Sequence, residues 1–83
     1  MHEHYRIAQR ALADLKAAVL VVLNGAPETG MSNADIGRTL GIYAGHKGHE
    51  GHIPRTLLDM LEEEGLVEQD SQTKLWKVIQ RNS

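Results

Sequence analysis

The sequence predicts a small α+β protein, mostly helical, in which three helices precede a two-stranded β-hairpin. Apolar residues recur at steps of three and four in three segments, which is the period of a helix with one buried face. A glycine follows each of these segments, and two short β-prone stretches separated by turn residues come last. With 83 residues, 41% hydrophobic and 24% charged, the chain has the size and composition of a single domain spanning residues 1–83.

The first predicted helix covers about residues 4–24. Its apolar residues lie three or four positions apart, and polar residues fill the opposite face; the apolar set is Ile7, Ala11, Leu15, Val19 and Val22. Asn24 and Gly25 are expected to end the helix, with Gly25 in the left-handed conformation, and Pro27 prevents its continuation. Leu20 and Val21 add apolar surface, which would form either a dimer contact or packing beneath the hairpin.

The second predicted helix covers about residues 32–41. Ser32 is a favourable N-cap, and Asp35 follows three residues later, which is a variant of the capping box. Ile36 and Leu40 share one face, and Gly41 is expected to close the helix. A connector rich in glycine and histidine follows over residues 42–52. It has no apolar period, so a loop is predicted.

The third predicted helix covers about residues 53–64. Pro54 suits its first turn, and its expected buried stripe is Ile53, Leu57, Leu58 and Leu61. Residues 66–79 then predict a hairpin whose turn contains residues 70–73. Because an isolated hairpin is marginally stable in water, we expect Val67, Trp76 and Val78 to cover the helices. Trp76 is therefore expected in the core in preference to stacking on a base.

Composition excludes several classes of protein. The chain has no cysteine, so disulfide scaffolds and thiolate zinc sites are excluded. The longest uncharged apolar run, from Ala17 to Leu23, is too short to span a membrane. The first residues do not resemble a signal peptide, so a cytoplasmic location is expected. No nucleophile, base and oxyanion hole are arranged in a recognisable motif, so neither an enzyme nor a small-molecule substrate or cofactor is predicted.

Charge is distributed unevenly along the chain, although the net charge is only −2. Residues 60–69 contain four glutamates and no basic residue, whereas residues 71–83 contain three basic residues and no acid. The region 38–58 is also basic, with Arg38, Lys47 and Arg55 against Glu50. A weakly acidic chain with local basic segments still permits binding to phosphate groups.

The run SNADIGRTLGI, followed by IPRTLLDMLEEEGLVEQ and KLWKVI, resembles the winged helix-turn-helix DNA-binding superfamily over about residues 6–79. The glycine-rich connector GHKGHEGH is similar to the winged-helix domains appended to restriction endonucleases of the methyladenine-dependent DpnI type. No nuclease motif accompanies it. The resemblance implies a winged-helix fold, with the hairpin as the wing, and sequence-specific binding of double-stranded DNA. It indicates a small transcriptional regulator or the DNA-reading part of a mobile-element or restriction-linked system.

In that superfamily the third helix enters the major groove, while the second helix and the wing contact phosphates. The resemblance therefore implies that the DNA-contacting residues are His52, Arg55 and Thr56 in the third helix, Ser32, Asn33 and Arg38 in the second helix, Lys47 in the connector, and Lys74 and Lys77 in the wing. Arg55 would bind guanine O6 and N7, and Thr56 would contact phosphate or a thymine methyl group. Two of these residues also have a purely structural alternative. Arg55 would pair with Asp59, and Ser32 would serve only as an N-cap.

Two other functions remain open at this point. His46, His49 and His52 recur every three residues and would ligate a metal in a metal-sensing repressor. That spacing places ligands on one face only in a helix, however, and the glycines favour a loop, so no metal site is predicted. A protein-interaction module is the other alternative, because the overall charge is acidic. A homodimer is expected for DNA binding, since one module covers little DNA surface.

Overall fold

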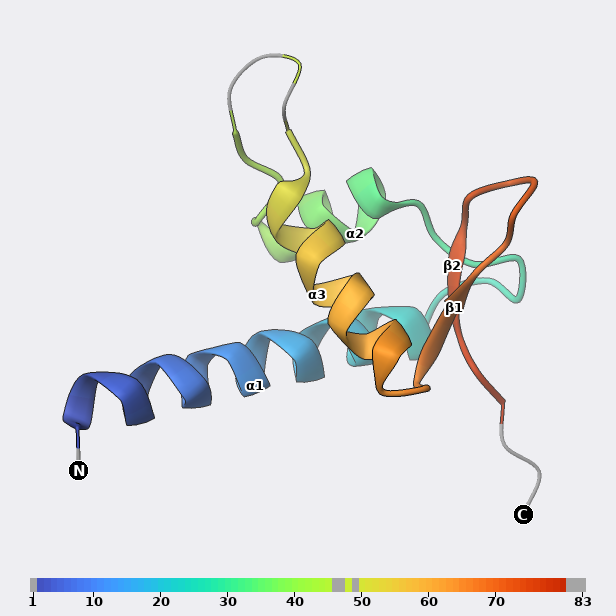
Figure 1. The fold of residues 1–83 in the computed structure, drawn as a ribbon. Helices are drawn as coiled ribbons and strands as arrows, with labels where there is room; N and C mark the ends of the chain where they lie inside the picture. Colours follow the sequence, from blue (N-terminus) through green and yellow to red (C-terminus); the bar gives the residue numbers. More distant parts are fainter. Residues whose placement is uncertain (1, 46–47, 49, 81–83) are drawn as a thin grey trace.

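A computed structural model describes residues 2–45, 48 and 50–80 of the chain. Three helices, α1 (Glu3–Asn24), α2 (Asn33–Leu40) and α3 (His52–Glu63), precede the strands β1 (Val67–Gln69) and β2 (Trp76–Val78). The strands form an antiparallel two-stranded sheet. Figure 1 shows α2 and α3 on one side of α1, with the hairpin beside the C-terminal half of α1. The predicted α+β class, three helices followed by a hairpin, is confirmed.

The core draws on every helix and strand. Its buried apolar side chains are Val19 and Leu23 of α1, Ile36 of α2, Leu57, Leu58 and Leu61 of α3, Val67 of β1 and Trp76 of β2. The predicted placement of Val67 and Trp76 against the helices is confirmed, and Val78 is half-buried against the same cluster. Burial of a large apolar side chain contributes about 1.5–3 kcal/mol. The hairpin is therefore stabilised by the helices that it covers.

The glycines after the helices differ in conformation. Gly41 closes α2 in the left-handed region with φ 73°, as predicted. Gly25, after α1, has φ −93° and is right-handed, so the expected left-handed cap there is wrong. The Gly25 amide donates to the carbonyls of Val21 and Val22, and the chain leaves the helix through a tightened last turn. The turn toward Pro27 is therefore made without a left-handed residue.

The buried face of α3 also differs from the expected stripe. Leu57, Leu58 and Leu61 are buried, but Ile53 is 45% exposed, so its predicted burial is wrong. Pro54 occupies the corresponding core position and is fully buried. Pro54 lies three and four residues before Leu57 and Leu58, which places all three on one face of the helix. Ile53 consequently faces the surface at the first turn of α3.

The loop between α1 and α2 adds a contact to the hairpin. Met31 forms an isolated antiparallel bridge with Trp76, with hydrogen bonds of 2.9 and 2.8 Å between their backbones. Gly30 precedes this bridge with φ +99°, and a Cβ placed there would lie 2.5 Å from the Trp76 carbonyl oxygen. Only glycine fits so close to that backbone. The bridge fixes the start of α2 relative to the hairpin.

The first turns of α1 extend beyond the rest of the molecule (Figure 1). All residues from His2 to Ala11 are exposed, and Leu12 and Leu15 are the first side chains of α1 that pack against the core. Further along, Lys16 forms an ion pair with Glu64 just beyond α3. No helix in the part of the chain that the structure describes is long and apolar enough to cross a membrane.

Candidate nucleic-acid interface

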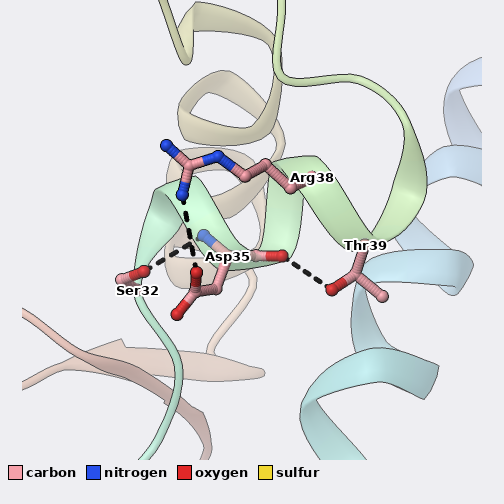
Figure 2. A network of polar contacts seen from close by, with 4 residues as sticks. All are labelled: Ser32, Asp35, Arg38 and Thr39. Atoms are coloured by element: carbon pink, nitrogen blue, oxygen red, sulfur yellow. Dashed lines mark hydrogen bonds and ion pairs between the residues drawn. The ribbon is translucent and has the colours of Figure 1, made fainter.

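The N-terminus of α2 is organised by Ser32, Asp35 and Arg38 (Figure 2). The Asp35 amide donates to the Ser32 hydroxyl at 3.1 Å, so Ser32 acts as the predicted N-cap. The Arg38 guanidinium lies 3.6 Å from the Asp35 carboxylate, and Thr39 Oγ1 donates to the Asp35 carbonyl at 2.7 Å. The Asp35 carboxylate thus pairs with Arg38, one turn along the same helix. Ser32 is used locally, and its predicted phosphate contact would compete with the cap.

Arg38 is held at the surface between two partners. Its guanidinium carbon lies 4.7 Å from the centroid of the Tyr43 ring, in addition to the Asp35 contact. The Arg38 side chain remains 63% exposed. Cation–π contact and a weak ion pair restrict the guanidinium without removing it from solvent. Arg38 is therefore an oriented, accessible cation beside the start of the connector.

Asn33 has a different environment from the one expected for a phosphate-binding residue. It is half-buried, and its side-chain nitrogen donates to the Gly51 carbonyl at 3.1 Å. Its side-chain oxygen is buried without a hydrogen-bond partner among the described residues. The amide thus links α2 to the residue just before α3. A phosphate contact by Asn33 would have to replace this bond, so the structure favours a positioning role for it.

The base of the connector is closed by close contacts around Tyr43. The Gly51 amide donates to the Ala44 carbonyl at 3.3 Å. A Cβ on Gly51, whose φ is +87°, would lie 2.8 Å from Asn33 Nδ2 and 2.9 Å from Tyr43 Cε1. A Cβ on Gly37 would lie 2.9 Å from both Tyr43 Cβ and Pro54 Cγ. These two glycines let α2 and the start of α3 approach closely, which fixes where the first turn of α3 is presented.

The exposed face of α3 carries the predicted base-contacting residues. His52, Arg55 and Thr56 are all exposed. The Thr56 hydroxyl donates to the His52 carbonyl at 2.8 Å. Among the described residues, no hydrogen bond or ion pair engages the Arg55 guanidinium, and the alternative pairing with Asp59 does not form. Arg55 is therefore available to an external partner.

The hairpin turn presents Lys74 in an unusual backbone conformation. The Asp70 carboxylate accepts from the amides of Gln72 and Thr73 at 2.8 and 2.9 Å, which defines the turn. Hydrogen bonds from the backbone of Thr73 and then Gln72 lower the pKa of the Asp70 carboxyl. Lys74 follows with φ 66°, and it is the one residue other than glycine with positive φ in the described part of the chain. This conformation costs about 1–2 kcal/mol for a residue with a side chain.

Lys77 is a weaker candidate than Lys74. In the register of the sheet Lys77 lies opposite Glu68, on the adjacent strand. Paired cross-strand residues project to the same face, so the carboxylate offsets the charge that Lys77 would offer to a phosphate. Both residues are exposed. Lys74 lies in the turn, outside the paired residues, and its backbone amide donates to the Asp70 carbonyl at 2.8 Å.

Lys47, His46 and His49 lie outside the residues that the structure describes. The phosphate contact of Lys47 therefore stays a prediction, and the alternative histidine ligand set stays untested. Within the described ranges, no group of three or more histidine, aspartate or glutamate side chains lies close enough to hold a metal.

Acidic residues accompany two of the accessible cations, since Asp35 pairs with Arg38 and Asp70 lies in the same turn as Lys74. Arg38 and Arg55 lie near the base of the connector, and Lys74 lies in the hairpin turn, whereas Glu62 and Glu63 are at the far end of α3. Figure 1 shows the hairpin turn extending away from α1. We call Arg38, Arg55 and Lys74 the basic rim. A polyanion would meet the consecutive glutamates 62–64 at the C-terminal end of α3, whereas at the rim the Asp35 carboxylate is already paired with Arg38.

Comparison of the chain with known protein families, with curated proteins and with solved structures found no match. The geometry described above therefore carries the functional argument alone.

Proposed function

We propose that this protein is a winged helix-turn-helix DNA-binding protein that places α3 in the major groove of double-stranded DNA. The observation that carries the proposal is Arg55: its exposed guanidinium, in the first turn of a helix that packs its apolar face into the core, has no partner among the described residues. A guanidinium in that position suits bidentate contact with guanine O6 and N7.

The two other members of the basic rim support the same proposal. Arg38 is oriented by Asp35 and Tyr43 yet stays exposed, as a phosphate-contacting side chain should be. Lys74 occupies a position where glycine would be less strained. A strained residue at the tip of a hairpin is consistent with a functional demand for its charge. His52, Thr56 and Lys77 complete the proposed contacts of α3 and the wing.

The proposal includes a transcriptional or restriction-linked role in the cytoplasm and a second copy of the chain. One module of this size covers about 600–1,000 Å² of surface on DNA, and pairing of two modules increases affinity and specificity. Val21, in the predicted dimer contact, is 72% exposed, and Leu20 is half-buried. Leu20 packs against the core, so of these two residues Val21 is the one accessible for pairing.

A titration of labelled duplex DNA, followed by fluorescence anisotropy at 50 and 200 mM salt, tests the proposal. We expect affinity to fall steeply with salt, since released counterions drive contacts to phosphate. Replacing Arg55 by alanine should weaken binding about 5- to 150-fold, the range for one bidentate contact to a base. Arg10→Ala is the matched control, because Arg10 is an exposed arginine in the projecting part of α1 and should leave affinity within about twofold.

Two results would contradict the proposal. Absence of salt-dependent binding at 50 mM salt would exclude duplex DNA as the partner. Equal losses from Arg55→Ala and Arg10→Ala would show that binding depends on charge alone and is not directed by α3.

A protein-interaction module is the second candidate, and one observation favours it. Asp59, Glu62 and Glu63 follow Arg55 along the exposed side of α3, so the C-terminal half of this helix would repel phosphates. A basic protein partner would suit that half. If the duplex titration fails, this candidate replaces DNA binding.

A further inference from the structure

A stripe of methyl-bearing side chains runs along α3, on the other side of its exposed face from Arg55. Ile53, in the first turn of α3, is 45% exposed. Thr56 lies three residues later and is exposed, and Met60 lies four residues after Thr56 and is half-buried. Residues separated by three and four positions are neighbours on one side of a helix. We call Ile53, Thr56 and Met60 the methyl stripe.

Thr56 contributes its methyl group to this stripe. Its hydroxyl already donates to the His52 carbonyl at 2.8 Å, within the same helix. A hydroxyl that is engaged with its own backbone is a poor donor to a phosphate. The group that Thr56 offers to a partner is therefore its Cγ2 methyl. Of the two contacts expected for Thr56, with a phosphate or with a thymine methyl group, the structure favours the thymine methyl group.

The arrangement combines an apolar side and a cationic side on one turn of a helix. At helical spacing Arg55 and Ile53 lie at opposite edges of the exposed face of α3, with Thr56 between them. The Arg55 guanidinium has no partner among the described residues. In the major groove, guanine presents acceptors that suit arginine, and the C5-methyl of thymine is the apolar group on the base edges. A helix turn that bears an apolar and a cationic side chain matches a major groove that offers thymine methyl groups and guanine acceptors.

We propose that Ile53 and Thr56 recognise the C5-methyl group of a pyrimidine in the major groove, next to the base that Arg55 contacts. This inference rests on the proposed docking of α3. It names the specificity of that site: a methyl-bearing pyrimidine, which is thymine or 5-methylcytosine, adjacent to guanine. Met60, further along the stripe and half-buried, flanks the contact.

The test begins with duplexes selected by the full-length protein from a random pool. In each selected duplex, thymines are replaced one at a time by deoxyuridine, which removes only the C5-methyl. We expect one or two positions at which affinity falls about fourfold, since burial of one methyl has that effect. In parallel duplexes, cytosine is exchanged for 5-methylcytosine. If 5-methylcytosine raises affinity, the protein recognises the C5-methyl group on either pyrimidine. If 5-methylcytosine has no effect but deoxyuridine lowers affinity, the protein recognises thymine alone.

Variants of the stripe connect the loss to the protein. Thr56→Ser keeps the hydroxyl and removes the methyl, so it should reduce discrimination between thymine and deoxyuridine. Thr56→Val keeps the methyl and removes the hydroxyl, so discrimination should persist. Ile53→Ala, an exposed change that favours the helix, should make the thymine and deoxyuridine duplexes bind almost equally.

The failures of the two proposals are distinguishable. Salt-dependent, Arg55-dependent binding with no deoxyuridine effect at any position would overturn the methyl contact and leave DNA binding intact. Unchanged discrimination in Ile53→Ala and Thr56→Ser would also overturn it. No binding of any duplex would overturn both and identify the methyl stripe as a surface for a protein.

Discussion

Replacement of Gly37 by alanine tests whether close packing between α2 and α3 sets the position of the proposed reading face. Gly37 is buried in the middle of α2. The added Cβ would lie 2.9 Å from Pro54 Cγ and 2.9 Å from Tyr43 Cβ. The Pro54 ring is fully buried and rigid, and Tyr43 Cβ is next to the backbone. Neither atom is the far end of a flexible side chain, so the helices must shift.

Two opposing effects determine the change in the free energy of unfolding. Alanine is a better helix former than glycine by about 1 kcal/mol, which would stabilise α2. Overpacking of a well-packed interior costs about 1–3 kcal/mol. With contacts on two sides and no flexible atom to yield, the cost should lie in the upper part of that range. We expect a net destabilisation of about 1–2 kcal/mol, or at least about 4 °C in Tm for a domain of this size.

Trp76 is the single tryptophan and is buried, so its fluorescence reports unfolding directly in a urea titration. Gly25→Ala is the matched control. Gly25 has φ −93°, and the nearest atom to its added Cβ would be 3.8 Å away, so this change should leave stability unchanged or raise it by up to about 1 kcal/mol. If Gly37→Ala proves as stable as the parent chain, the reasoning on the contact between α2 and α3 is refuted.

Two further predictions concern the hairpin turn. Lys74→Gly should relieve the strain of the positive φ and stabilise the protein by about 0.5–1 kcal/mol. The same change should weaken DNA binding and reduce the slope of log affinity against log salt concentration by about one. Equal or lower stability in urea would contradict the assignment of strain. Because hydrogen bonds lower the pKa of Asp70 in the folded state, its contribution to stability is complete above its unfolded pKa and should be lost as pH falls below about 4. Asp70→Asn keeps an oxygen acceptor without titrating, so its urea midpoint should depend less on pH between 5 and 3; an identical pH dependence in both proteins would exclude this role.

The sequence was sufficient for the order and type of the elements, because each helix has a clear apolar period and a glycine after it. It misplaced Ile53 for an identifiable reason. Ile53 and Pro54 both precede Leu57 at helical spacing, and periodicity alone favours the isoleucine as the more apolar residue. Proline is also suited to the first turn of a helix, and here it occupies the buried position. The exposed Ile53 became the basis of the proposed methyl contact.

Sequence patterns could not predict the contacts between segments that are distant along the chain. The bridge between Met31 and Trp76 involves one residue of a loop, so it has no periodicity to detect. The bond from Asn33 to Gly51 likewise joins residues whose proximity depends on the packing of α2 against α3. The positive φ of Gly30 and Gly51 follows from these contacts. Glycine in a loop indicates such conformations but does not indicate which atoms will be close.

The residues that position the first turn of α3 differ from the residues proposed to touch DNA. Asn33, Gly37 and Tyr43 set the relation between α2, the connector and α3. Arg38 and Arg55 are accessible cations on the structure that results. Changes in the first group should alter stability and affinity together, whereas changes in the second should alter affinity with little effect on stability, since exposed charges contribute little to folding.

In the proposed complex, DNA is bound by the first turn of α3 together with the hairpin turn. The most direct measurement is a titration of the ¹⁵N-labelled protein with duplex DNA, followed by amide chemical shifts. We predict that the largest changes fall on residues 51–56 and 72–75, with residues 3–11 unchanged. Changes concentrated on residues 3–11, or on the acidic end of α3 at 62–64, with none at 51–56, would contradict the claim.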